Sequence, residues 1–483
     1  MSPNTGFERW SPLPLAFPAE GLVGQVEDGP KRGGAALAMG IWAPTLLLAG
    51  GAIATGYTIA GLAMGALAMV VHSLIDPRVA VIAMILVIPC DWMVTAIPQV
   101  STVSKLLGVW ALFVSLPKLL PSVAPNAWDP CVKWIGGLIV WAAIGLFWAR
   151  YPQAVIGGWQ SLVLTWGIPV LVCIQFKDLA SVRALLILYV LGCTLSAAAY
   201  ILVGDVHAVA EGSKRLETQS LIGGGQEEGI NPNSIARNFG LAFFAAIYLI
   251  IVFKGVVRRL LLVGGLMVII LAIMILKARA VYLALPGALV ASVVMLKGGG
   301  LARRMLLVLV MSVIGGAAGL VAMKTGFLGE GVEQRFASIF EEGVHSGNRL
   351  ELWTGHVKVF LASGMMGVGL NQMAYRSESF AHVAHNDWFS LLGTLGLVGV
   401  ACFAAFHFNL ARRMWRLEDV WAKMLCLGLW TFLLLCGLTQ DDYVHKHYTI
   451  AVGIILALMR IGEERDSRSG LQTRPAAMDS WSG

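Results

Sequence analysis

The sequence has few charged residues. Asp, Glu, Lys and Arg make up 13% of its 483 residues, whereas hydrophobic residues make up 57%. A typical soluble domain is about one quarter charged. A soluble chain of this length would also divide into several domains joined by polar linkers, and no long polar linker interrupts the middle of this one. The composition excludes an ordinary soluble multidomain protein and favours a chain that spans a membrane.

Several motifs of soluble enzymes are missing as well. The seven cysteines lie in or beside apolar stretches without CxxC spacing, which indicates packing residues rather than a redox or metal site. No HExxH or carboxylate-rich metal spacing occurs, and no phosphate-binding or dinucleotide fingerprint surrounds Gly298-Gly299-Gly300. The net charge of +7 lies in short clusters between apolar segments, so we expect no nucleic-acid partner. We expect no metal and no cofactor.

Apolar stretches of the right length to cross a bilayer fill the chain. A hydrocarbon core about 30 Å thick needs about 20 helical residues. We expect twelve to fourteen spans in an all-α transmembrane bundle, with the first two assigned least firmly. The expected ranges are 35–53, 57–75, 79–97, 103–120, 131–148, 154–175, 182–203, 234–253, 259–276, 280–297, 302–323, 385–409, 422–440 and 446–461.

The regions outside these spans complete the expected organisation. The first 30 residues lack the basic-then-apolar order of a cleaved signal peptide. We interpret residues 1–34 as a disordered cytosolic tail, residues 35–461 as the transmembrane domain, and residues 462–483 as a second disordered cytosolic tail.

The charges between the spans predict an orientation. Basic residues gather on the cytosolic side of membrane proteins. With both termini in the cytosol, the basic clusters after the sixth, eighth, tenth, twelfth and last spans all fall on that side, whereas Asp441 and Asp442 lie outside. One external connection, residues 324–384, is long. Within it Leu350, Trp353 and Val357 recur at helical spacing, which predicts an amphipathic helix that lies on the outer surface or acts as a packing lid.

Two arginines near the external side are candidates for binding an anion. Arg279 lies in a short turn between two apolar runs, and Arg349 opens the predicted amphipathic helix, where free backbone N–H groups also favour anions. A guanidinium matches phosphate oxygens in pairs. The alternatives are an interfacial arginine for Arg279 and an arginine paired with a carboxylate such as Glu351 for Arg349.

A histidine at the outer entrance of the twelfth span is the candidate for proton transfer. His385 is followed by Asn386, and an imidazole can exchange a proton near neutral pH. The alternative is a histidine that only packs at the interface. His382 lies nearby, so position alone does not single out His385.

The stretch from Ser346 to Val400 resembles the O-antigen ligase and polymerase family of bacterial envelope glycan enzymes. Arg349 to Trp353 is similar to the family's R-x-x-x-W start of its periplasmic helix. Met366 to Leu370 resembles its P-x-G-x-G turn, although Met365 stands where proline is common. The run that starts at His385 resembles its H-N signature with later L and G-L-x-G positions. Upstream, Asn231-Pro232-Asn233 and Arg279 also resemble family positions.

The resemblance implies a GT-C-like glycosyltransferase that uses neither a metal nor a nucleotide sugar. Its donor would be a glycan on undecaprenyl diphosphate at the periplasmic face of the bacterial inner membrane. Its acceptor would be a lipid-linked repeat or lipid A–core, and a chain-length regulator or other assembly proteins could be partners. Arg279 and Arg349 would hold the diphosphate, and His385 would take the proton of the acceptor hydroxyl. Asn386, Asn233 and Trp353 are further candidates for substrate binding.

Other functions remain open at this point. A transporter or flippase of lipid-linked glycans would place ionisable residues near mid-span and would show internal pseudo-symmetry. We see few charges at mid-span and no clear repeat, so an enzyme is favoured. A non-catalytic scaffold is a third possibility. Between polymerase and ligase we slightly favour a polymerase, because polymerisation systems for exported polysaccharides are widespread.

Overall fold

A computed structural model describes residues 58–93, 103–122, 129–203, 232–276, 278–294, 349–373 and 384–472. The predicted spans 35–53 and 302–323 lie outside these residues, as do the whole predicted tail 1–34 and residues 473–483 of the other predicted tail. The chain divides into two compact units, Met1–His72 and Ser73–Gly483. Of the first unit the structure describes only Thr58–His72, which belongs to α2 (Thr58–Ile75). The helices described below belong to the second unit.

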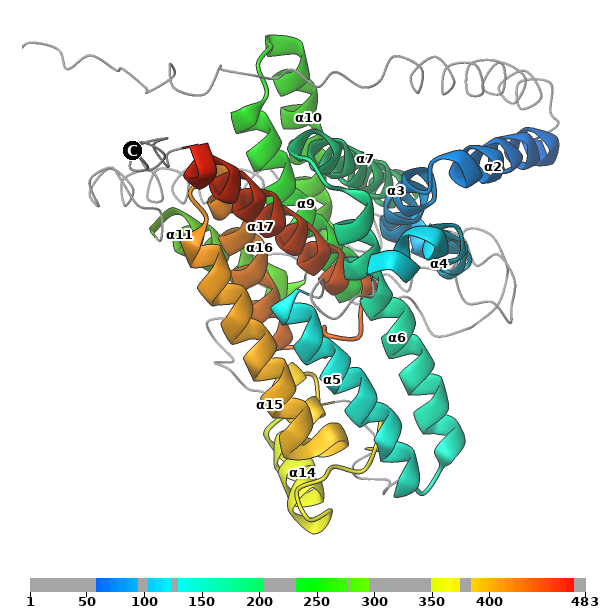
Figure 1. Ribbon diagram of the computed structural model, residues 1–483, viewed down its shortest axis with the longest axis vertical. Helices are drawn as coiled ribbons and strands as arrows, with labels where there is room; N and C mark the ends of the chain where they lie inside the picture. Colours follow the sequence, from blue (N-terminus) through cyan, green and yellow to red (C-terminus); the bar gives the residue numbers. More distant parts are fainter. Residues whose placement is uncertain are drawn as a thin grey trace, which may run out of the picture. The chain divides into compact units, whose positions relative to one another are not determined.

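The described residues form helices and no strands, which confirms the all-α prediction. The elements that follow α2 along the chain are α3 (Arg78–Val87), the 3-10 helix η1 (Ile88–Met93), α4 (Val103–Ser122), α5 (Pro130–Ile144), the 3-10 helix η2 (Gly145–Phe147), α6 (Pro152–Gln175), α7 (Leu179–Val203), α9 (Pro232–Val252), α10 (Val256–Leu276), α11 (Arg279–Val294), α14 (Arg349–Ala362), α15 (Asp387–Arg416), α16 (Val420–Gly437) and α17 (Lys446–Gln472) (Figure 1).

Six described helices are long and apolar enough to cross a membrane, namely α6, α7, α9, α10, α15 and α16. Shorter apolar helices occupy Gly65–Ile75, Cys131–Phe147 and Ala280–Val293. Helices suit this setting because every backbone polar group is bonded within the segment. The chain is therefore a multi-pass membrane protein, as predicted. The last helix, α17, runs past the predicted end of its span at 461.

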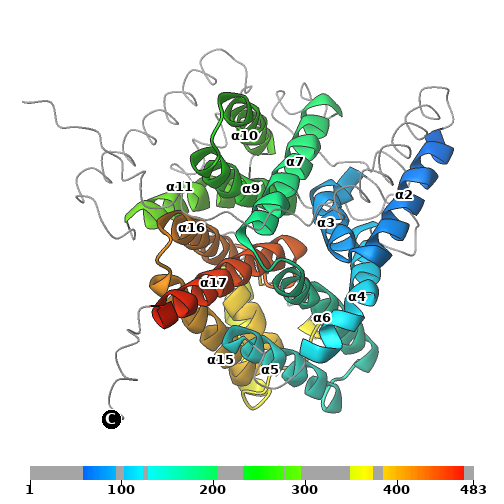
Figure 2. The same cartoon turned by 45° about the horizontal axis from the view of Figure 1, so that its top comes forward.

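Neighbouring helices pack through small residues. The most extensive packing joins α11 with α16, α9 with α10, α5 with α15, and α6 with α17, and Figure 2 shows these helices grouped in one bundle. A methyl group added at Gly428 would meet the Phe244 ring at 2.6 Å, and one at Gly287 would meet Leu435 at 2.9 Å. Small residues at such positions let helices approach closely where lipid supplies no hydrophobic drive.

The helices share two ends, which we name after one residue at each. The "His385 end" holds the starts of α9, α15 and α17 and the end of α16, which polar contacts join directly. The "Arg413 end" holds the end of α15, the start of α5 and the later part of α17.

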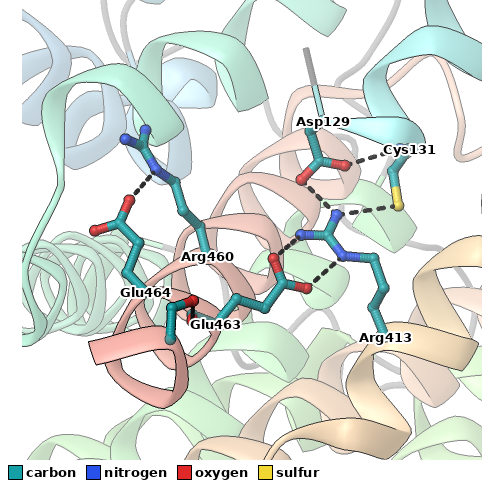
Figure 3. A network of polar contacts seen from close by, with 7 residues as sticks. Asp129, Cys131, Arg413, Arg460, Glu463 and Glu464 are labelled. Atoms are coloured by element: carbon teal, nitrogen blue, oxygen red, sulfur yellow. Dashed lines mark hydrogen bonds and ion pairs between the residues drawn. The ribbon is translucent and has the colours of Figure 1, made fainter. Parts of the chain in front are cut away.

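An ion-pair network fastens the Arg413 end (Figure 3). The Arg413 guanidinium donates to both carboxylate oxygens of Glu463 at 2.8 Å and also pairs with Asp129. Asp129 caps α5 by accepting from the Cys131 N–H at 2.8 Å. Arg460 bonds Glu464 and the Cys173 carbonyl, which joins α17 to α6. These contacts fix the C-terminal part of α15 against α5 and α17.

A break at Gly396, where φ is +66° and ψ is −159°, separates the N-terminal part of α15 from the rest of the helix. The connection after α14 fills this break. Val368 and Gly369 donate backbone N–H groups to the carbonyls of Gly393 and Thr394 at 3.1 and 2.8 Å, and Leu397 donates to Met365 at 3.0 Å. The backbone groups freed by the break are thus satisfied by another segment, as burial requires.

Candidate active site at the His385 end

His385 lies in the turn that begins α15. Its φ of +52° is in the left-handed region, which costs a non-glycine residue of order 1–3 kcal/mol and persists only where the surroundings fix it. Asn386 provides that fixation. Its side-chain oxygen accepts from the N–H groups of Trp388 and Phe389 at 2.9 and 3.3 Å, and its amide donates to the Leu438 carbonyl at 3.2 Å. Asn386 is buried, and it caps α15 and ties it to α16.

The helix that starts with Arg349 is held against the same turn. Trp353, one turn after Arg349, donates its indole N–H to the carbonyl of Ala384, the residue before His385, at 3.0 Å. The Trp353 ring also stacks on Phe389 with centroids 5.0 Å apart. The start of α14 and the His385 turn are therefore joined by one side chain, which brings two of the predicted site residues to the same place.

The helix predicted in this connection is present as α14, and Trp353 and Val357 of the predicted apolar positions are half-buried. Leu350 is 65% exposed, and the buried residues of α14 are Gly355 and His356. His356 packs against Gly393 of α15 and holds its Nδ1 2.9 Å from the Leu352 carbonyl, so Nδ1 carries the proton. Burial lowers the pKa of His356, which keeps the ring neutral. The spacing of apolar residues in the sequence did not identify His356 as a packing residue.

Beneath the turn lies a buried ionic cluster made by Arg237, Asp387, Asp441 and Asp442. Arg237 of α9 and Asp442 form an ion pair whose side chains are 1% and 0% exposed. Asp387 accepts from the backbone N–H groups of Asp442 and Tyr443, and Asp441 accepts from the N–H of Asn386 at 3.0 Å. These bonds dock the connection between α16 and α17 onto the His385 turn.

The cluster holds three carboxyl groups and one guanidinium, so burial favours protonation of some of the carboxyl groups. Burial raises the pKa of Asp441 to about 7, a value at which the carboxyl is partly protonated in neutral solution. Burial acts in the same direction on Asp442, but the charge of Arg237 and the neighbouring His447 outweigh it and lower the pKa of that group. Burial lowers the pKa of His445 to about 4, so this ring is neutral.

Arg279 is the first residue of α11, and its side chain is not among the described ones. The backbone position follows from the packing of α11 against α16, in which Gly287 faces Leu435. Eight helical residues span about 12 Å, so Arg279 begins its helix near the level of the α16–α17 connection. The Trp353 contacts therefore join the segments of Arg349 and His385, whereas the place of Arg279 in the site stays a prediction from the sequence. Lys277 lies outside the described residues.

Asn233 lies at the start of α9, one turn before Arg237, and so shares a helix face with it. The sequence reasoning missed Arg237 and treated Asp441 and Asp442 only as loop charges. The available signal was an arginine inside the apolar span predicted at 234–253, because such a charge is costly in a membrane without a partner. Its partner lies 205 positions later and could not be identified from one sequence.

Comparison with known proteins agrees with the resemblance seen in the motifs. Residues 264–404 match a family model described as O-Antigen ligase. The matched segment contains Arg279, Arg349 and His385, whereas Arg237, Asp441 and Asp442 lie outside it. No curated protein sequence matches the chain.

Proposed function

We propose, from the premise that residues 264–404 carry the O-antigen ligase signature, that this protein is a membrane glycosyltransferase which moves an oligosaccharide or polysaccharide from undecaprenyl diphosphate to an acceptor glycan. The observation that carries the proposal is the Trp353 bridge, which joins the helix of Arg349 to the turn of His385. This bridge supports a shared site for the Arg349 guanidinium and the His385 imidazole, because groups held in position lower the barrier to displacement of a diphosphate.

The proposed reaction is one direct displacement. The acceptor hydroxyl oxygen forms a bond to the anomeric carbon and passes its proton to His385. The bond between that carbon and the diphosphate oxygen breaks, the electron pair stays with the diphosphate, and the configuration inverts. Arg279 and Arg349 stabilise the charge that develops on the leaving group, which requires no metal. Fixed cations suit this task because they need no reorganisation during the reaction.

The buried cluster supports this chemistry through position. Arg237 and Asp442 are almost fully buried, so they hold the scaffold rather than contact a large glycan. Asp441 holds the N–H of Asn386, and Asn386 in turn caps the helix behind His385. We therefore assign Asp441, Asp442 and Arg237 as positioning residues for the His385 turn.

The direct test uses the purified protein, a lipid-diphosphate oligosaccharide and an acceptor, and it measures release of undecaprenyl diphosphate. Arg349→Ala and His385→Ala should each reduce turnover by about a hundredfold or more, since each removes an interaction made with the reacting groups. Arg412→Ala, an exposed arginine at the opposite end, is the matched control and should retain turnover. Unchanged turnover in either site variant would remove that residue from the mechanism.

The acceptor decides between the two activities of the family. We favour a polymerase, whose acceptor is a second lipid-linked glycan, over a ligase that acts on lipid A–core. Mass analysis of envelope glycans from a deletion strain separates them. A single-repeat product indicates a polymerase, whereas long unattached chains indicate a ligase.

A further inference from the structure

A cavity of about 210 Å³ lies between α3, α4, α6 and the start of α17, all within the second unit. Figure 2 shows α3, α4 and α6 grouped together. The α6 wall of the cavity extends from Gly157 to Ile168, a length of about 16 Å at the usual helical rise. None of the residues assigned above to the transfer reaction lines this cavity.

Three polar side chains of α6 line the cavity, those of Gln160, Ser161 and Thr165. Helix α6 is long and apolar enough to cross a membrane, where a polar group without a partner is unfavourable. Within the part of the chain that the structure describes, none of these three side chains makes a hydrogen bond. Thr165 is only 6% exposed, so the cavity is the space to which its side chain has access. These groups are therefore available to a ligand in the cavity.

The start of α17 lies beside these polar groups. Gly453 of α17 lies against Pro169 of α6, and the ring of Tyr448 packs on that of Trp166. Because both contacts advance in the same direction along the two helices, Lys446 lies about level with the middle of the α6 wall.

The charged side chains of the lining are engaged within the protein. Lys446 pairs with Asp91 at 2.8 Å, and the Ser104 hydroxyl contacts both of them. Lys105, the other cation that lines the cavity, is not free either. Recognition is therefore left to the uncharged amide and hydroxyl groups of α6, each of which can both donate and accept a hydrogen bond.

The other lining residues are mostly apolar or have no side chain. Met84, Ile88 and Leu164 supply apolar groups, and Gly108 and Gly157 supply none. Ligand sites commonly combine apolar walls with a few polar groups that fix the orientation of the ligand. A sugar ring matches this lining, because it carries C–H groups on its faces and hydroxyl groups around its edge.

The size of the cavity limits the ligand. About seven water molecules at ~30 Å³ each would fill it. Sites for drug-sized ligands begin at about 300 Å³. One sugar ring therefore fits, whereas a whole oligosaccharide does not.

The cavity wall is linked to the His385 turn through one layer of residues. Trp166 follows Thr165 in α6 and donates its indole N–H to the Tyr443 carbonyl at 3.1 Å. The Tyr443 N–H donates to Asp387 at 3.1 Å, and Asp387 lies two residues after His385. A ligand in the cavity would thus lie near the proposed site of transfer.

We propose that this cavity binds one sugar residue of the glycan substrate through the side chains of Gln160, Ser161 and Thr165. These contacts select a sugar without touching the reacting atoms, so the three residues determine specificity. The proposal rests on the proposed function for the identity of the glycan, and its test needs no transfer reaction.

Two substitutions alter the cavity without disturbing the fold. Thr165→Val keeps the shape of the side chain and removes its hydroxyl. A Cβ atom at Gly157 would meet no heavy atom within 4 Å, so Gly157→Leu should fold and fill the cavity. Thr194→Val in α7, where the hydroxyl bonds the Val190 carbonyl of its own helix, and Gly264→Leu in α10, which is equally open, are the matched controls.

The experiment measures binding of a free oligosaccharide to the purified protein in detergent by calorimetric titration. The probe is the glycan released from the lipid-diphosphate oligosaccharide that the turnover assay uses. Thr165→Val should weaken binding by about fivefold, as loss of one neutral hydrogen bond predicts, and Gly157→Leu by about tenfold or more. Thr194→Val and Gly264→Leu should bind as the wild type does. No binding to the wild type, or equal affinity in all five proteins, would overturn the proposal.

Two further measurements separate this proposal from its alternatives. A polyprenyl monophosphate without sugar should not displace the probe, and displacement would assign the cavity to the lipid carrier and contradict the proposal. His385→Ala is assayed for turnover alongside the binding series. Lost turnover in that variant with unchanged probe binding in Gly157→Leu would reject the sugar site and leave glycan transfer intact. Unchanged turnover with weakened binding in Gly157→Leu would do the reverse.

Discussion

At the scale of single residues, the buried carboxyl groups under His385 set the conditions for the site. Asp387, Asp441 and Asp442 lie together with one guanidinium, that of Arg237. Since uncompensated buried charge is unfavourable, the protonation of this cluster depends on pH, and the docking of the α16–α17 connection depends on it in turn.

Asp441 provides a test of this dependence. Burial raises the pKa of Asp441 to about 7 in the folded protein, whereas this carboxyl has an ordinary pKa near 4 in the unfolded chain. Between these two pH values the folded protein keeps a proton that the unfolded chain has released. The stability contributed by this group is full below about pH 4 and is lost as the pH rises to about 7. Asp441→Asn keeps an acceptor for the Asn386 N–H and cannot ionise. It should match the wild type below about pH 4, be more stable by about 1–2 kcal/mol at pH 5, and be more stable by at most about 4 kcal/mol at pH 8.

Thermal unfolding of the purified protein between pH 5 and 8 measures this difference. Glu418→Gln, at an exposed carboxyl between α15 and α16, is the control and should follow the wild-type curve at every pH. Parallel curves for Asp441→Asn and the wild type would show that Asp441 does not hold a proton in the folded state.

The limits of sequence reasoning at this scale follow from distance along the chain. Arg349, Trp353 and His385 stand in short local motifs, and the structure brings their segments together. The roles of Arg237 and Asp442 depend on each other, and nothing local at either position encodes a partner 205 residues away. The capping role of Asn386 depends only on its near neighbours in the chain, but the role predicted for this residue was substrate binding.

At the scale of elements, α14 and the part of α15 before Gly396 form one structural unit. Trp353 and His356 of α14 pack on the α15 segment that precedes Gly396, and the backbone of residues 365–369 fills the break. A methyl group at Gly367 would lie 2.5 Å from both the Gly396 nitrogen and the Thr394 carbonyl oxygen, and one at Gly396 would collide with the Met365 carbonyl. Each of these two positions therefore requires glycine, because the backbone of the other segment leaves no room for a Cβ atom.

Alanine substitution tests this requirement. Gly367→Ala and Gly396→Ala each combine left-handed backbone strain with a backbone collision, so each should destabilise the fold by about 3 kcal/mol or more. Gly364→Ala has the same sign of φ but meets no atom within 4 Å, so it should cost only about 1 kcal/mol. Denaturation midpoints give the order. Equal effects at all three positions would show that the paired backbones contribute nothing beyond local strain.

Helix positions were largely predictable, and the break was not. The spans predicted at 154–175, 234–253 and 259–276 correspond to α6, α9 and α10 within three residues at each end, because long apolar runs dominate their placement. The span predicted at 385–409 is continuous in hydropathy, and α15 extends beyond it. Hydropathy cannot show the break at Gly396, because the backbone groups that satisfy it come from a segment about 30 residues earlier.

At the scale of the whole second unit, a group of basic residues marks one end. Arg413, Lys423 and Arg460 gather at one end, and the candidate site lies at the other. This arrangement supports the proposed orientation, in which the Arg413 end faces the cytosol and the site faces the periplasm of the inner membrane.

Cysteine labelling tests the orientation. Leu350→Cys presents an exposed thiol at the His385 end and should react with an impermeant maleimide added to intact cells with a permeabilised outer membrane. Arg412→Cys, exposed at the other end, should react only after the inner membrane is opened. The seven native cysteines set the background, which the unmodified protein measures in parallel. The reverse pattern would invert the proposed topology.

The break in α15 also constrains how this region can be exchanged with that of a relative. The segment around Gly367 forms backbone hydrogen bonds that a continuous helix would have formed within itself, so the broken helix and this segment depend on each other. A chimera that takes from a relative only the helix after His385, or only the turn around Gly367, would combine two segments whose backbones do not match at the break. A functional graft has to carry residues 349–399 as one cassette, and the same coupling predicts that insertions are tolerated outside that cassette more readily than within it.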